Sequence, residues 1–344
     1  MGVNLTPIIV NKKIIKIKDL SFKTLAIDAN NELYQFLSLI RMRNGTPLMD
    51  KEGRITSHLN GLIFRSTHLI YEYGIKPIFV FDGSPPILKK DEIEKRSRVR
   101  ERAIKEWEFA RMIGNYDTAY SKAVVSSKLT KDMIEDAKYL LKLLGLPYVQ
   151  APSDAEAQAA YMAKKGDVWA SSSRDYDSLL FGTPRLIRYL TISGTEYLPS
   201  KRIVRPLKPE VIELDNFLRG IGITREQLID IAILIGTDFN KGVKGIGPKK
   251  ALKLIKKYGS IERLPNYIKS NVDENYEDVR KIFLNPQVTN NYKIEFGIVD
   301  EDRLYEFLCE ERGFSRDRMR KIVERMRQSH LKLQQTSLNS YSTL

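Results

Sequence analysis

Residues 22–28 read Phe-Lys-Thr-Leu-Ala-Ile-Asp, an apolar run that ends in a carboxylate. The same pattern recurs at residues 75–82 (IKPIFVFD) and at residues 168–177 (VWASSSRDYD). Short apolar runs of this kind are typical of buried strands, and helical patterns separate them at residues 60–73 and 130–144. Strands that alternate with helices predict an α/β fold with a doubly wound, mainly parallel sheet, in which ligands bind beyond the carboxyl ends of the strands.

Two regions interrupt this alternation. Residues 85–128 contain no strand-like run and are densely charged, which predicts a helical insertion after the second strand. From Leu228 onward the pattern is mainly helical, with a glycine-rich turn at residues 242–247. The length of 344 residues suits two domains, or one large α/β unit with insertions.

The composition is that of a globular protein, with 42% hydrophobic and 29% charged residues. No run approaches the ~20 apolar residues that a membrane-spanning helix needs, and lysines interrupt the first twenty residues. We therefore expect a cytoplasmic protein with no membrane partner. A single cysteine, Cys309, cannot form a disulfide framework, and with three histidines far apart in the sequence a zinc site is not expected.

The charge balance favours a polyanionic partner. The chain has 57 basic and 43 acidic residues, a formal net charge of +14 and a pI near 9.5. Residues 95–105 (KRSRVRERAIK) hold six basic side chains and one acidic side chain. This run predicts a helix that follows a phosphate backbone or clamps a phosphodiester, and a solvated helix face is the alternative.

Seven acidic residues lie where the predicted strands end or near the ends of neighbouring helices. They are Asp28, Asp82, Asp154, Glu156, Asp175, Asp177 and Asp238. If they converge, the mutual repulsion of the carboxylates requires bound cations, and oxygen ligands without histidine or cysteine favour Mg²⁺ or Mn²⁺. Asp175 and Asp177 are two residues apart, so in an extended chain they would project to one side and hold one ion together.

Each acidic residue also has a structural alternative. Ser153 and Glu156 have the spacing of a capping box, which alone would explain Glu156. Asp154 and Glu156 do not share a helix face, so their spacing alone is a poor indication of a metal site. An isolated aspartate at a strand end is often a turn former. The metal hypothesis therefore depends on all seven residues meeting.

Residues 242–250 (GVKGIGPKK) join two helical patterns. Their glycines would let backbone amides approach a phosphate, and the next helix adds its N-terminus and two lysines. Pro248 stands where a Walker loop requires lysine, which excludes that motif. A plain turn between two helices is the alternative.

Six strings in order carry a resemblance that covers nearly the whole chain. They are LAIDANNELYQFL (25–37), TSHLNGL (56–62), IKPIFVFDGSPP (75–86), APSDAEAQAAYMA (151–163), SRDYDSLLFG (173–182) and IGTDFNKGVKGIGPKKAL (235–252). With these strings the chain resembles the flap endonuclease family of structure-specific 5′ nucleases, especially its archaeal members. The resemblance implies a PIN-like 5′-nuclease fold with a helical arch and a helix–two-turn–helix DNA-binding region. It also implies two-metal cleavage of branched DNA at the base of 5′ flaps, with 5′–3′ exonuclease activity, in replication (Okazaki fragment maturation) and repair.

In this family the seven carboxylates would hold two Mg²⁺ ions about 4 Å apart, with Mn²⁺ as a substitute. Lys89 and Arg96 match a catalytic basic pair of the arch that steers the scissile phosphate. Tyr34 matches an aromatic residue that stacks on a base near the cut, and core packing is its alternative. The implied DNA contacts are Tyr34, Arg41, Arg65, Gly236, Gly245, Gly247, Lys249 and Lys250, with K⁺ assisting the glycine-rich turn. None of these contacts reads base edges, so specificity should follow DNA shape.

Two features set this chain apart within the resemblance. The family usually has glutamate at Asp154, so we expect metal binding to be retained with slower chemistry or an altered Mg²⁺/Mn²⁺ preference. Gln335, Leu338 and Tyr341 match a sliding-clamp (PCNA) interaction motif, but Ser342 stands where a second aromatic residue is usual. The missing aromatic residue predicts weaker clamp binding than a complete motif would give. We expect the protein itself to be a monomer.

The resemblance also divides the chain into regions. These are an N-terminal nuclease region with the start of the arch (1–102), the arch and linker (103–119), an internal nuclease region with the helix–two-turn–helix (120–262), a C-terminal helical region (263–333) and the clamp motif (335–344). Two rival functions stay open, a related 5′ nuclease specialised for gaps, bubbles or RNA primers, and a DNA-binding scaffold with a degenerate site. The presence of all seven acidic residues argues against the scaffold.

Overall fold

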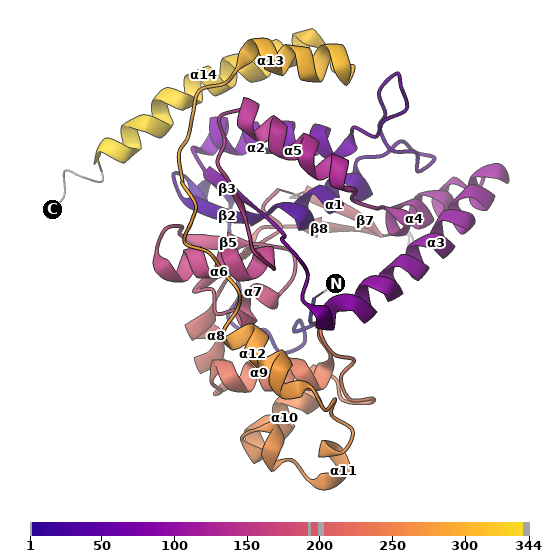
Figure 1. The fold of residues 1–344 in the computed structure, drawn as a ribbon, viewed down its shortest axis with the longest axis vertical. Coiled ribbons are helices and arrows are strands. Elements are labelled where there is room, and N and C mark those ends of the chain that lie inside the picture. The colour runs from indigo at the N-terminus through magenta and orange to yellow at the C-terminus, as the bar shows by residue number, and fades with distance from the viewer. Residues whose placement is uncertain (1, 192–193, 199–202, 340–344) are drawn as a thin grey trace.

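A computed structural model describes residues 2–191, 194–198 and 203–339 (Figure 1). A seven-stranded sheet with the strand order β1-β9-β6-β5-β2-β3-β4 forms the centre, and β7 pairs with β8 in a separate hairpin. The strands are β1 (Lys13–Ile14), β2 (Thr24–Asp28), β3 (Lys76–Phe81), β4 (Tyr148–Gln150), β5 (Ala170–Ser172), β6 (Arg185–Arg188), β7 (Gly194–Leu198), β8 (Ile203–Leu207) and β9 (Glu210–Glu213).

The sheet is parallel from β6 to β4, and β9 and β1 add an antiparallel edge. The three predicted strands correspond to β2, β3 and β5, and the doubly wound, mainly parallel α/β fold is confirmed. The sequence analysis did not find β1, β4, β6 or β9. These strands have only two to four residues each, too few to show an apolar period.

Alternate residues of β2 enter two different cores, as the pleat requires. Leu25 and Ile27 belong to a large core that includes residues of α1, α2 and α5, whereas Ala26 belongs to a smaller core that includes residues of α6. Figure 1 shows α2 and α5 on one side of the sheet and α6 on the other. These helices are α1 (Ala29–Leu39), α2 (Ser57–Tyr73), α5 (Lys131–Leu143) and α6 (Ala155–Lys165), so that α2 and α5 confirm the two predicted helices.

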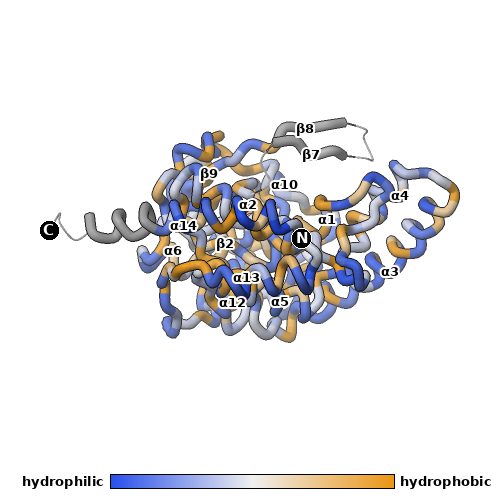
Figure 2. The backbone as a smooth tube through the Cα atoms, turned by 90° about the horizontal axis from the view of Figure 1, so that it is seen from above, coloured by the Kyte–Doolittle hydropathy of each residue, from blue (hydrophilic) through white to orange (hydrophobic). Residues whose placement is uncertain are grey.

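The insertion after β3 is a pair of helices, α3 (Lys90–Met112) and α4 (Tyr116–Ser126), preceded by a short 3-10 helix (Ile87–Lys89). The pair projects from the body of the molecule (Figures 1 and 2). Along α3 only Ala103 and Ala110 are buried, so most of the helix faces solvent. The predicted helical insertion is confirmed, and its charged sequence fits this exposure.

A third core lies below the sheet in Figure 1. It is built from α7 (Asp177–Leu180), α8 (Leu214–Ile221), α9 (Arg225–Ile235), α10 (Pro248–Tyr258), α11 (Asn266–Lys269) and α12 (Tyr276–Leu284), with a 3-10 helix at Ile261–Arg263. Another 3-10 helix, Ile17–Leu20, packs against the large core instead. α9, the glycine-rich turn and α10 form the predicted helix–turn–helix unit.

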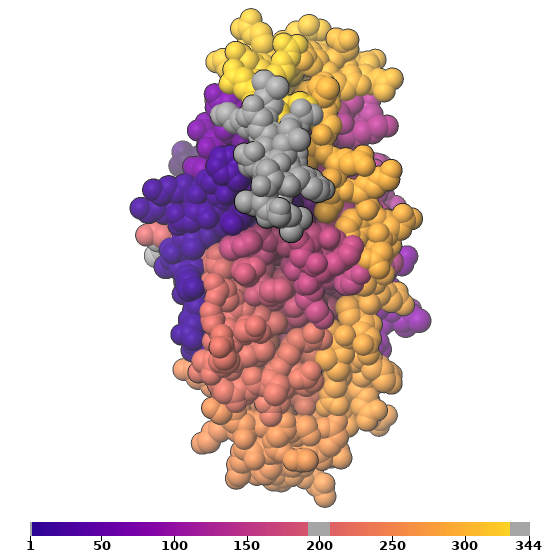
Figure 3. Space-filling view, turned by 90° about the vertical axis from the view of Figure 1, so that its left-hand side faces the viewer, coloured from indigo at the N-terminus to yellow at the C-terminus, as the bar shows by residue number. Residues whose placement is uncertain are grey.

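An extended segment, residues 285–300, runs along the side of the molecule and joins this lower core to the last helices (Figures 1 and 3). Gly297 N–H donates to the Gly145 carbonyl at 2.8 Å, which fixes the segment beside the end of α5. The last helices are α13 (Glu301–Tyr305), a π-helical turn (Glu306–Glu311) and α14 (Arg316–Asn339), which lies against α2. In the described part of the chain, no helix has the length and apolarity to cross a membrane.

Candidate active site

Neighbouring parallel strands bring the first two carboxylates to one edge of the sheet. β2 ends at Asp28, which is buried and caps α1 by accepting a hydrogen bond from Asn31 N–H at 2.9 Å. Asp82 follows β3, which pairs with β2, and accepts from Ala155 N–H at 2.8 Å while its side chain reaches solvent. Both side chains therefore lie beyond the carboxyl ends of the strands, where an α/β sheet binds its ligands.

The start of α6 adds Asp154 and Glu156. Asp154 is the N-cap, since its carboxylate accepts from Glu156 N–H at 3.0 Å. The capping box expected from Ser153 is absent from this helix, so capping does not explain Glu156. The Glu156 carboxylate is buried and accepts from Ser178 Oγ at 3.2 Å, and its charge interacts with those of Asp28 and Asp177.

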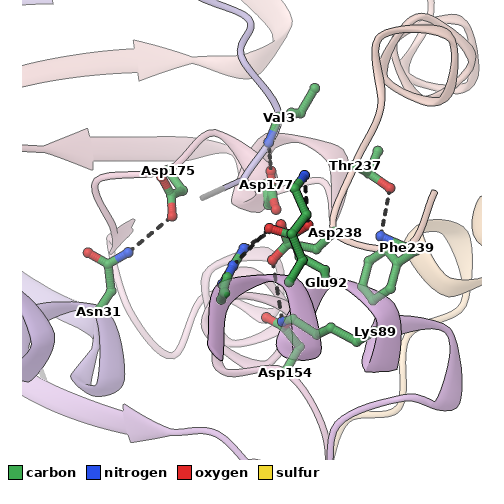
Figure 4. A network of polar contacts seen from close by, with 12 residues as sticks. Val3, Asn31, Lys89, Glu92, Asp154, Asp175, Asp177, Thr237, Asp238 and Phe239 are labelled. Atoms are coloured by element: carbon green, nitrogen blue, oxygen red, sulfur yellow. Dashed lines mark hydrogen bonds and ion pairs between the residues drawn. The ribbon is translucent and has the colours of Figure 1, made fainter. Parts of the chain in front are cut away.

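Asp175 and Asp177 come from the loop after β5. The expectation of an extended run here is wrong, because Tyr176 has helical dihedral angles and Asp177 begins α7. The two side chains consequently diverge (Figure 4). Asp175 accepts from Asn31 Nδ2 at 3.2 Å, whereas the buried Asp177 accepts from Val3 N–H at 2.8 Å.

The base of the insertion brings two cations, Lys89 and Arg96, to this cluster. Figure 4 shows Lys89 beside Asp154. Lys89 Nζ lies 3.0 Å from Asp154 Oδ2 and 3.8 Å from Asp238 Oδ2. Arg96 donates to Asp238 Oδ1 at 2.7 Å and to Glu92 at 3.0 Å. Asp238, buried in the turn after α9, thus joins the lower core to the insertion and to the sheet edge.

Burial and repulsion make this cluster hard to ionise. Burial, with the neighbouring Asp82, raises the pKa of Asp28 well above its usual range. Burial, with the charge of Asp177, does the same to the pKa of Glu156. The pKa of Asp177 itself is raised to about 8, chiefly by burial. Positive charge inside the cluster would relieve these costs.

Lys89 shows the opposite response to the same surroundings. Its partial burial alone would lower the pKa of the ammonium group, but the nearby carboxylates of Asp154, Asp82 and Asp238 raise it above its usual value. The site therefore favours cations strongly. In the described part of the chain no three His, Cys, Asp or Glu side chains are arranged as the ligand shell of one ion. The donor set nevertheless suits a hard cation, because every candidate ligand is a carboxylate.

The predicted DNA contacts occupy two regions around this cluster. Tyr34, on α1, is half-buried and lies outside the buried core, with the Arg100 guanidinium 5.9 Å from its ring centre. Arg65 is exposed on α2. Arg41 is engaged by the protein itself, since it donates to the Gly45 carbonyl at 2.7 Å and to Ser127 Oγ at 2.8 Å.

The glycine-rich turn forms the second region. Gly236 and Gly245 have left-handed backbone angles (φ of 105° and 79°), and Gly247 is the N-cap of α10. Around Gly245 and Gly247 no described atom lies within 4 Å of where a Cβ would stand. Lys249 and Lys250 are exposed in the first turn of α10. The turn therefore offers an open, basic helix N-terminus of the kind that binds phosphate.

Comparison with known proteins shows which family the chain belongs to. Two family models match it, the XPG N-terminal domain over residues 1–103 and the XPG I-region over residues 145–238. Flap endonuclease 1 of Staphylothermus marinus is 50% identical, covering 99% of each chain, and that of Pyrococcus horikoshii is 48% identical, covering 99% of this chain and 98% of the relative. This chain belongs to the flap endonuclease family. It is a metal-dependent nuclease of DNA replication and repair.

Solved structures of flap endonucleases and their relatives agree with this fold. Flap endonuclease-1 from Methanococcus jannaschii has a TM-score of 0.76 at 41% identity, covering 95% of this chain and 98% of that one. The catalytic core of Rad2 in complex with DNA substrate has a TM-score of 0.66 at 25% identity, covering 92% and 96%. The family resemblance and the α/β nuclease fold expected from the sequence are confirmed.

Three groups at this flap endonuclease site escaped the sequence analysis. Asn31 connects the site internally, donating from its backbone to Asp28 and from its side chain to Asp175. The backbone N–H of Val3 binds Asp177, and a Cβ on Gly2 would lie 2.4 Å from the same carboxylate. The adjacent Asn30 and Asn31 after a strand-end aspartate were a usable signal, whereas the N-terminal contact left none.

Proposed function

We propose that this flap endonuclease cuts branched DNA at the base of 5′ flaps by two-metal-ion hydrolysis with Mg²⁺. The observation that supports the proposal is that the seven carboxylates interact through their charges, while Lys89 and Arg96, at the base of the projecting helical arch, pair with Asp154 and Asp238. A basic arch over an acidic metal site suits a substrate with a free single-stranded 5′ end beside a duplex.

The proposed ligands are the seven carboxylates named above, Asp28, Asp82, Asp154, Glu156, Asp175, Asp177 and Asp238. When bound, two divalent ions activate water and stabilise both the attacking and the leaving oxygen of the phosphodiester. Asn31 holds Asp28 and Asp175 in place by its two hydrogen bonds.

In this proposal Lys89 and Arg96 transfer their contacts to the scissile phosphate. Both now face carboxylates, at 3.0 Å from Asp154 and 2.7 Å from Asp238. Cations that bind at those carboxylates would release the two side chains toward a non-bridging phosphate oxygen. A guanidinium and an ammonium placed there stabilise charge that develops in the transition state.

The remaining contacts are proposed to position the DNA. Tyr34 is half-exposed beneath the arch, where its ring can stack on a base. The turn with Gly245 and Lys249 binds duplex phosphates, and its backbone also binds K⁺. Arg65 contacts the duplex near the junction. Arg41 acts indirectly, through the loop whose Gly45 carbonyl oxygen it binds. These contacts reach phosphates and ring faces, so recognition follows the shape of the branch.

We further propose that a sliding clamp binds the C-terminal motif of this otherwise monomeric protein. Gln335 and Leu338 belong to α14, and Tyr341 lies outside the described residues. The motif spacing supports this proposal.

The proposed function is tested by cleavage of end-labelled 5′-flap, 3′-flap and plain duplex DNA in Mg²⁺ and in EDTA. We expect Mg²⁺-dependent cutting of the 5′ flap near its junction, lost in Asp175→Ala and retained in Asp132→Ala, a control at an exposed position on α5. Binding of the flap without cutting, in Mg²⁺ and in Mn²⁺, would contradict the proposal and favour a DNA-binding scaffold.

A further inference from the structure

A buried arginine, Arg188, contacts the loop that carries Asp175 and Asp177. This arginine has no role in the chemistry proposed above. Arg188, at the end of β6, is 7% exposed. Its Nε donates to the carbonyl oxygen of Arg174 at 2.8 Å, and its Nη1 donates to the hydroxyl of Tyr176 at 2.6 Å. The guanidinium also lies 3.9 Å from the ring centre of Tyr176. Arg188 thus contacts the residues on both sides of Asp175.

The sheet fixes the position of this guanidinium. Arg188 and Glu210 are paired across β6 and β9, and Arg188 Nη1 lies 2.7 Å from Glu210 Oε1. Glu210 is 4% exposed and takes a second cation, Lys12 Nζ, at 2.8 Å. Nη2 of Arg188 donates to the hydroxyl of Tyr189 at 2.9 Å. Because the buried guanidinium makes several hydrogen bonds in fixed directions, only one orientation is available to it. The sheet can therefore fix the position of the loop through this side chain.

The loop makes other hydrogen bonds as well, among them Ser173 N–H to the carbonyl oxygen of Ile187 at 3.1 Å and Leu179 N–H to that of Tyr176 at 2.9 Å. Asp175 N–H donates to Ser173 Oγ at 3.2 Å, and the Tyr176 hydroxyl shares a hydrogen bond of 3.1 Å with Thr6 Oγ1. The bond from Arg188 to the Arg174 carbonyl sets the peptide plane directly before Asp175. Rotation of that plane would swing the Asp175 carboxylate away from Asn31 and from the cluster.

We infer that Arg188 is a positioning residue for metal binding, which orients Asp175 and Asp177 toward the ions through the backbone of residues 174–176. This inference rests on the proposed metal site. Groups that orient metal ligands from behind typically affect metal affinity by about 10- to 100-fold. Lysine cannot replace Arg188, because one ammonium group can pair with Glu210 but cannot also span Arg174 and Tyr176.

The test compares Arg188→Lys with Arg185→Lys in the full chain. Arg185 is a matched control on the same strand, since it donates to a backbone carbonyl, of Trp169, at 3.3 Å and lies over the Trp169 ring, but touches no metal-site loop. Mn²⁺ binding without DNA is measured by electron paramagnetic resonance, alongside thermal melting. We expect Arg188→Lys to weaken Mn²⁺ binding about 10-fold or more, and Arg185→Lys to bind Mn²⁺ as the wild type does.

A second variant, Tyr176→Phe, guards against a failure of Arg188→Lys to fold. It keeps the bond from Arg188 to the Arg174 carbonyl and removes the hydroxyl that contacts Arg188 Nη1 and Thr6 Oγ1, so we expect a several-fold weaker Mn²⁺ affinity with the fold intact. Wild-type affinity in folded Arg188→Lys, or in Tyr176→Phe where the first variant is unfolded, would overturn the inference and leave Arg188 a stabilising residue. If the wild type itself bound no Mn²⁺, the proposed metal site would fail and the inference with it.

Discussion

Asp154 has two roles, as the cap of a helix and as the partner of a cation from the arch. Its carboxylate caps α6 at 3.0 Å from Glu156 N–H and pairs with Lys89 at 3.0 Å. Both contacts hold the short side chain close to its own backbone. A glutamate, the usual residue of the family at this position, would extend one methylene farther toward the other carboxylates.

We therefore predict that Asp154→Glu raises the single-turnover rate of flap cleavage in Mg²⁺ by about tenfold, since small displacements of a reacting group cost rate steeply. The ratio of the rates in Mg²⁺ and Mn²⁺ should change as well, because Mg²⁺ demands more regular octahedral geometry. Single-turnover rates in each metal measure both effects. Identical rates for the variant and the wild type in both metals would refute the prediction.

Asp177 provides a test of the electrostatics at the same scale. Its folded pKa of about 8 lies above its unfolded value near 4, so the folded chain keeps a proton that the unfolded chain releases between these values. Rising pH in this window therefore costs the metal-free folded state progressively more stability. In Asp177→Asn this cost is absent.

The stability of Asp177→Asn relative to the wild type should accordingly increase from pH 5 to pH 8.5. Urea unfolding in EDTA at both pH values measures the difference, with Asp132→Asn on the exposed start of α5 as control. A stability difference that stays constant across the two pH values would show that the Asp177 carboxyl ionises normally.

Among the elements, α3 is the one that joins the projecting insertion to the acidic cluster. It buries only two alanines along its length, yet its base reaches the acidic cluster through Arg96, with Lys89 directly before the helix. We predict that Lys89→Ala and Arg96→Ala each lower single-turnover cleavage about 10²-fold, with little change in duplex binding. Arg98→Ala is the matched control, because Arg98 lies on the same helix with a side chain 81% exposed. Equal losses in all three variants would mean that charge on the arch matters, and its position does not.

The elements also show which parts of the fold a sequence can reveal. β2 and β3 were predictable because each is an apolar run that ends at or next to an aspartate, and β5 because the apolar residues 168–170 lead into it before Asp175. β6 and β9 were not predictable, because each has only four residues and is recognised as a strand by its pairing with the other, in which Arg188 lies opposite Glu210. The capping box at Ser153 and the extended run through Asp177 do not form. Asp154, one residue after Ser153, caps α6 instead, and Asp177 begins the short helix α7.

At the scale of the whole molecule, the site exists only because the topology gathers residues from 28 to 238. The strand ends and the family resemblance pointed to the seven carboxylates and to Lys89 and Arg96, which the structure brings into contact or charge interaction with one another. Arg188 and the Val3 contact could not be found in this way, because they depend on long-range packing.

Clamp binding is a prediction at this scale. Deleting residues 335–344 should abolish stimulation of cleavage by a sliding clamp and leave unstimulated cleavage of the 5′ flap unchanged, because the active site lies in other elements. Cleavage rates with and without the clamp, for the full chain and the truncated chain, measure this. Persistent stimulation of the truncated chain would contradict the assignment of the motif.

Binding of two ions by the seven carboxylates can be seen by anomalous diffraction from a crystal of this protein with 5′-flap DNA and Mn²⁺. We expect two Mn²⁺ peaks about 4 Å apart among these carboxylates, beside the scissile phosphate and beneath Lys89 and Arg96. A single peak, or peaks bound outside this cluster, would contradict this expectation.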